Sequence, residues 1–113
     1  MIFALAALLA LAAPADEPAP PEVEQAAAAW SECLGDRLAQ AEDSTRPEII
    51  ADAMIEHCRP QQEAALAAHG RWLDSSALDA AEKEEARSAM TRSVRDMRRQ
   101  IIAELRRARA RRD

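Results

Sequence analysis

The chain is poor in the residues from which many catalytic and ligand-binding sites are built. Its 113 residues include no tyrosine, one phenylalanine, two glycines, two histidines and two cysteines. The two glycines are isolated, at Gly35 and Gly70, so they cannot form a glycine-rich phosphate-binding loop. No segment shows the alternation of apolar and polar residues that is typical of a half-buried strand. The sequence offers no catalytic residues and no cofactor site, and we expect a non-enzymatic protein.

An uninterrupted apolar run opens the chain. Residues 2–13 are all apolar, and small residues follow at 13–15. The run is shorter than the roughly 20 residues that cross a bilayer. It has the length of a signal-peptide apolar core, about 7–15 residues, although no Lys or Arg precedes it. We therefore expect residues 1–15 to be a cleaved signal peptide, and the protein to be exported, either periplasmic or secreted.

The remainder of the chain has the composition of a small helical domain. Residues 16–20 are acidic and rich in proline, and we expect a disordered lead-in there. Apolar residues then recur at steps of three and four, which predicts helices over about 21–42, 46–69 and 77–112. Residues 21–113 should thus form a single all-α domain. Because alanine supplies much of its apolar content, the core should be thin and should need a covalent tie.

Several residues indicate where the helices begin and end. Thr45-Arg46-Pro47-Glu48 has the form of a capping box, which favours a helix start. Pro60 lacks a backbone donor and should kink or split the second helix. Gly70 is suited to end it as a left-handed cap. Ser76, with Asp79 three positions later, is a weaker start signal for the third helix.

The two cysteines predict a disulfide. In an exported chain an even cysteine count favours bridging. In an antiparallel hairpin over residues 21–70, Cys33 and Cys58 fall at similar heights. A metal site that adds His57 and His69 is the alternative, but the spacing matches no zinc pattern. A redox pair would normally show Cys-x-x-Cys.

Charge is divided unevenly along the chain. Residues 16–85 hold 17 acidic and 5 basic side chains, a net charge of −12, whereas residues 86–113 hold 3 acidic and 10 basic, a net charge of +7; together they give the overall −5. Such asymmetry often marks an interaction segment. The basic part coincides with the third expected helix.

That last helix carries an apolar stripe beside its arginines. The candidate interaction face comprises Met90, Val94, Met97, Ile101 and Leu105 together with Arg95, Arg98, Arg99 and Arg106. Three interpretations stay open. The stripe packs on the chain's own hairpin, it drives self-association, or the arginine face binds an anionic membrane surface or polyanion.

Nucleic acid is disfavoured as a partner, because the chain is net acidic and no aromatic residue lies among the arginines. In outline the chain is similar to small periplasmic chaperones and metal-stress sensors. Their repeated Leu-Thr-x-x-Gln motif is absent, so this likeness assigns no residue a role. We expect a disulfide-tied antiparallel helical hairpin plus a long amphipathic C-terminal helix, acting through self-association or an unknown protein partner. The rival hypotheses are a metal-binding or redox protein that uses Cys33, His57 and Cys58, and an anionic-surface binder.

Overall fold

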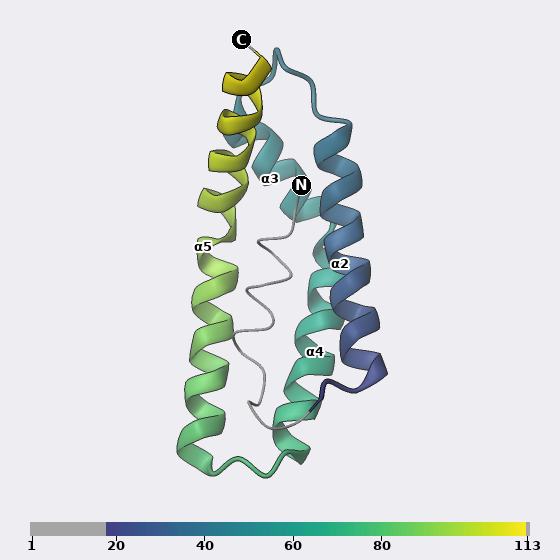
Figure 1. Cartoon of the computed structure of the whole chain (residues 1–113), viewed down its shortest axis with the longest axis vertical. Helices are drawn as coiled ribbons and strands as arrows, with labels where there is room; N and C mark the ends of the chain where they lie inside the picture. Colours follow the sequence, from purple (N-terminus) through teal and green to yellow (C-terminus); the bar gives the residue numbers. More distant parts are fainter. Residues whose placement is uncertain (1–17, 113) are drawn as a thin grey trace.

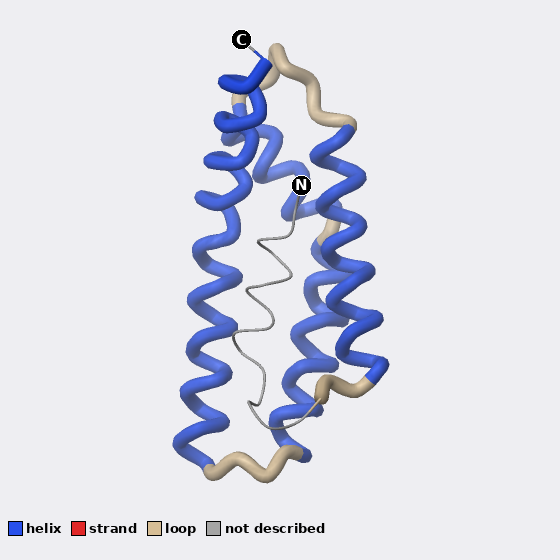
Figure 2. Tube along the Cα trace, in the orientation of Figure 1, coloured by secondary structure: helices blue, strands red, loops and turns tan. Residues whose placement is uncertain are grey.

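The protein is an elongated bundle of helices, about 49 Å long (Figure 1). The computed structural model describes residues 18–112, and all regular secondary structure in this range is helical (Figure 2). The helices are α2 (Pro21–Ala39), α3 (Pro47–His57), α4 (Arg59–Ser75) and α5 (Ala80–Arg112). The predicted all-α fold is confirmed. The expected signal peptide at 1–15 and the start of the lead-in lie outside the described residues.

The predicted hairpin is formed by α2 and α4, which lie antiparallel and side by side (Figure 1). A disulfide between Cys33 of α2 and Cys58 joins them, with the two Cα atoms 5.8 Å apart. This bridge confirms the predicted cysteine pairing. Helix α2 begins at Pro21 as expected, but it ends at Ala39, where the last turn tightens and the amides of Gln40 and Ala41 bond to carbonyls three residues back.

The segment expected as one helix over 46–69 is two helices. Helix α3 ends at His57, and α4 begins at Arg59. The break at Cys58 agrees with the expected effect of Pro60, whose nitrogen cannot donate to a carbonyl four residues earlier. The expectation that Gly70 ends the helix is wrong. No described glycine has a positive φ, and α4 continues to Ser75, because the extra turns bury Trp72 and Leu73.

Both predicted capping signals are displaced. The N-cap of α3 is Arg46, without a side-chain cap, so the expected capping box at Thr45 does not form. Pro47 sets this start, since its fixed φ suits the first helical position. The last helix begins at Ala80 rather than 77. Asp79 is its cap: Oδ1 of Asp79 accepts from the Glu82 amide at 2.8 Å, and Oε1 of Glu82 accepts from the Asp79 amide at 3.1 Å.

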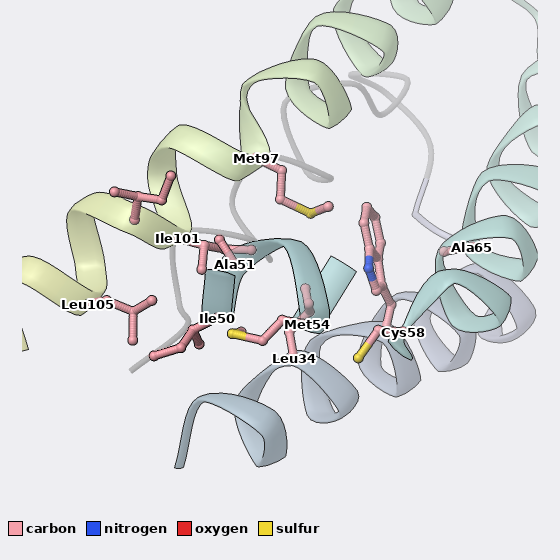
Figure 3. Packing of buried hydrophobic residues seen from close by; sticks show 11 residues of the cluster. Leu34, Ile50, Ala51, Met54, Cys58, Ala65, Met97, Ile101 and Leu105 are labelled. Atoms are coloured by element: carbon pink, nitrogen blue, oxygen red, sulfur yellow. The ribbon is translucent and has the colours of Figure 1, made fainter. Parts of the chain in front are cut away.

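All four helices contribute to one main core (Figure 3). Its buried members are Trp30, Leu34, Ile50, Ala51, Met54, Cys58, Ala65, Met97, Ile101, Ile102 and Leu105. A smaller cluster of Val23, Ala68 and Trp72 closes the other end of the hairpin, and Ala19 packs against it. Since Ala19 belongs to the expected disordered lead-in, at least this part of the lead-in is held against the bundle. Helix α3 connects the hairpin to α5 and is the element on which α5 packs most.

Candidate functional site

The apolar stripe predicted on the last helix faces the interior of its own chain. Met97, Ile101 and Leu105 are buried in the main core, and Figure 3 shows Ile101 and Leu105 beside Ala51 and Ile50 of α3. Val94 is partly buried and packs against the same core, and Met90 is also buried. This is the packed arrangement, the first of the three interpretations. As an interaction face, the stripe stays a prediction.

Two of the predicted arginines tie α5 to α3. Nε of Arg98 donates to Oδ1 of Asp52 at 2.7 Å, and Nη2 of Arg106 donates to Oε1 of Glu48 at 2.7 Å. All four side chains lie at the surface or only half-buried, so each pair contributes little to stability. The two pairs join α3 to α5 at two points along their contact.

These contacts alter the acid strength of the carboxylates. The hydrogen bond from Arg98, together with its charge, lowers the pKa of Asp52 below the ordinary value for aspartate. The pKa of Glu48 is also lowered, first by a hydrogen bond from a backbone amide and then by the charges of Arg106 and Arg46. Both carboxylates therefore stay ionised to a lower pH than the same groups in an unfolded chain.

The other arginines of α5 also have partners within the chain. Arg95 and Arg99, the remaining two of the predicted face, both contact Asp96 of their own helix. Further along, Arg112 pairs with Asp43 in the loop after α2. Apart from Arg111, every arginine of α5 has a carboxylate or carbonyl partner within residues 18–112. Four of these pairs join α5 to carboxylates outside it, so the basic helix offsets part of the negative charge of the acidic segment.

Of the residues of the alternative metal or redox site, the structure joins the two cysteines directly. Both sulfurs are joined in the bridge between Cys33 and Cys58. His57 is exposed at the end of α3, whereas His69 is buried in α4, with its ring edge-on to Trp72 at a centroid distance of 5.8 Å. Within the described part of the chain, no group of His, Cys, Asp and Glu side chains is arranged to hold a metal ion.

The outer face of α3 presents a feature that the periodicity of the sequence did not single out. Ile49 is 55% exposed, and it is the one large apolar side chain that residues 18–112 leave exposed. It borders a groove of about 200 Å³ between α3 and the end of α2. The groove is lined by Arg37, Gln40, Ala41, Thr45, Ile49, Ile50, Ala53 and Met54. The adjacent pair Ile49-Ile50 carries only a weak signal, since neighbouring residues of a helix lie on different sides of it but can both be buried, as Ile101 and Ile102 are.

A second cavity, of about 370 Å³, lies where the ends of α2 and α5 approach each other. Its apolar floor includes Leu38, Leu105 and Ala108, and its rim carries arginines, among them Arg111. Two helix C-termini meet there, and their backbone dipoles favour cations, so the rim arginines partly serve to balance them. The helix dipoles and Asp43 therefore reduce the positive charge that this rim presents to an anion.

Comparison with known proteins finds no match, whether to a family model, to a curated protein sequence or to a solved structure. None of the helices in the described range has the length and apolar character required to span a membrane. The face of α3 around Ile49, the disulfide and the paired arginines are thus the features from which a function must be inferred.

Proposed function

We propose that the protein is exported and works without catalysis, as a helical binding module that associates with a protein surface through α3. The observation that carries this proposal is Ile49, an exposed isoleucine at the edge of a groove. A single exposed apolar residue is ordinary on protein surfaces. This one differs because Ile50 and Met54 form an apolar wall of the groove beside it. A partner would therefore cover the Ile49 side chain and the adjoining groove together.

The support beneath α3 makes this surface suitable for recognition. On its inner side Ile50, Ala51 and Met54 are buried in the main core. Asp52 and Glu48 connect it to α5, and the disulfide at Cys58 fixes its far end to α2. A rigid surface loses little conformational entropy when it binds, which favours affinity.

Export is supported by the apolar run at 2–13 and by the bridge, since structural disulfides persist in oxidising compartments. The alternative hypotheses gain no specific support. A metal site would need thiolates, and both sulfurs are held in the bridge, whereas redox exchange would need access to sulfurs of which Cys58 is completely buried. An anionic surface would have to compete with carboxylates of the same chain for the guanidinium groups of α5.

The binding proposal is tested with a photo-crosslinking amino acid placed at Ile49 in the native cells. Ala29, exposed on α2, is the matched control position. We expect covalent adducts at position 49 in clear excess over position 29. Equal yields at the two positions would contradict a role for α3.

Export is tested separately, by the mass of the protein recovered from the periplasm or the medium. The expected species begins near Asp16 and is two protons lighter than its reduced form. A full-length, reduced protein retained in the cytosol would refute this half of the proposal.

A further inference from the structure

Four residues of the α3 region form a stripe on its outer side. Arg46, Ile49, Ala53 and Glu56 follow one another at steps of three, four and three, and all four are exposed. Residues at this spacing are neighbours on one helix face. From first to last the stripe spans eleven residues, or ten steps of 1.5 Å, about 15 Å in all.

The order of residues in this stripe makes it complementary to a second copy of the same stripe that runs in the opposite direction. If a second copy of α3 lies antiparallel, with a two-fold axis at the height of Ala51, Arg46 stands opposite Glu56 of the second copy. Ile49 then stands opposite Ala53 of the second copy. Because a two-fold interface repeats every contact, both pairings occur twice. Charge meets opposite charge at the two ends, and a large side chain meets a small one between them.

The groove supplies the space that this pairing requires. Ala53, Ile50 and Met54 line the hollow beside Ile49, so an isoleucine arriving opposite Ala53 enters it. A cavity of about 150 Å³ lined by aliphatic and aromatic side chains accommodates a benzene molecule. The groove of about 200 Å³ therefore has room for a branched aliphatic side chain.

The charged ends of the stripe are available for such a contact. The side chains of Arg46 and Glu56 are 76% and 73% exposed. Each has only a local partner: Glu48, at 3.7 Å from Arg46, and Arg59, at 2.9 Å from Glu56. Exposed pairs of this kind are weak and are readily exchanged for a partner's charge.

From this self-complementarity we propose that the partner recognised by α3 is a second copy of the same chain, in an antiparallel homodimer. The inference rests on the proposed function, since it names the occupant of the same surface. An 11-residue helix is about 16 Å long, so the interface is smaller than the roughly 1,200 Å² of total buried area at which stable complexes begin. The dimer is therefore reversible and depends on concentration.

The test is a charge-reversal experiment followed by sedimentation equilibrium of the purified, disulfide-bonded protein. The variant Arg46→Glu places Glu opposite Glu56, and Glu56→Arg places Arg opposite Arg46. Like charges facing each other twice should weaken each homodimer at least about tenfold. An equimolar mixture of the two variants has opposite charges at both contacts, so it should dimerise close to the wild-type level. Glu32→Arg, an equal change of charge on the exposed face of α2, should leave the dimer intact.

Each other outcome overturns the inference. A wild-type protein that is monomeric at all concentrations refutes the dimer, and variants that dimerise as wild type refute this surface. If both variants are weakened but their mixture is not restored, the antiparallel pairing is wrong. If position 49 crosslinks to a different protein and the wild type is monomeric, the proposed function stands. Only the inference that the partner is a second copy of the chain is then refuted. Thermal unfolding of each variant, followed by circular dichroism, verifies that the fold is unchanged.

Discussion

Removal of the Cys33–Cys58 bridge tests how this alanine-rich bundle is held together. The perturbation is the double variant Cys33→Ala/Cys58→Ala, compared with the native protein in the presence and absence of a reductant. Alanine is preferred to serine because Cys58 is completely buried, and a buried hydroxyl without a hydrogen-bond partner would add its own cost.

The expected magnitude follows from the length of chain that the bridge closes. The cysteines are separated by 25 positions, and in the chain-entropy model such a crosslink contributes about 3.5 kcal/mol. Small domains have a free energy of unfolding of about 5–15 kcal/mol, so the bridge represents a large share of the total. At roughly 4–8 °C per kcal/mol, its loss should lower the Tm by about 14–28 °C.

The assay is urea unfolding followed by circular dichroism at the helical signal. Wild type with reductant and the double variant should both lose about 3.5 kcal/mol relative to the oxidised protein. Reductant should not change the double variant, which controls for other effects of the reagent. A loss below about 1 kcal/mol, the ordinary effect of a point mutation, would refute the argument that the bridge holds the hairpin.

Three further changes test the continuity of α4 at Gly70, the core and the charge pairs. Gly70→Ala should raise the free energy of unfolding by about 1 kcal/mol, because Gly70 lies inside α4 and an added Cβ meets no atom within 4 Å; a lower melting temperature would contradict this. Met97→Ala should lower the free energy of unfolding, measured in urea, by about 2–5 kcal/mol, since Met97 is 2% exposed. The control Thr91→Ala, at an exposed position, should change it by no more than about 0.5 kcal/mol. Similar losses for the two variants would be inconsistent with the core as described. The pKa values of Glu48 and Asp52 are lowered on folding, so the two ionised carboxylates stabilise the folded state. This contribution to the free energy of unfolding is complete above about pH 5, and it is lost as the pH falls below the ordinary carboxyl pKa of about 4. Glu48→Gln with Asp52→Asn should therefore flatten the decline of the urea midpoint between about pH 5 and 2, and an unchanged decline would refute these two groups as its source.

The covalent and periodic features of the fold were predictable from the sequence, and the local ends of its helices were not. The cysteine pairing and the apolar stripe of α5 follow from patterns in the sequence, whereas the sequence left open what covers that stripe. At Gly70 the local preference for a helix end was outweighed by the burial of Trp72 and Leu73, a tertiary effect. At Thr45 the neighbouring Pro47 determined the first helical position instead.

The candidate site was harder to predict because it depends on how three elements meet. The arginines of α5 are conspicuous in the sequence, yet their carboxylate partners on α3 lie more than forty positions away. Ile49 appears in the sequence as one more apolar residue beside Ile50. Only the placement of α3 against the end of α2 shows that Ile50 is buried, that Ile49 is exposed, and that a groove adjoins it.

Cys58 has a consequence for when this surface comes into existence. The residue ends α3, begins α4 and is bonded to α2, so three helices share one covalent joint. Helix α3 has 11 residues, and isolated helices shorter than about 12–15 residues are marginal in water. We expect a newly made chain with two free thiols to hold α3 loosely, and two such chains to meet without pairing. Formation of the disulfide would then determine when two chains can associate, and association would start only in the compartment where the bridge can form.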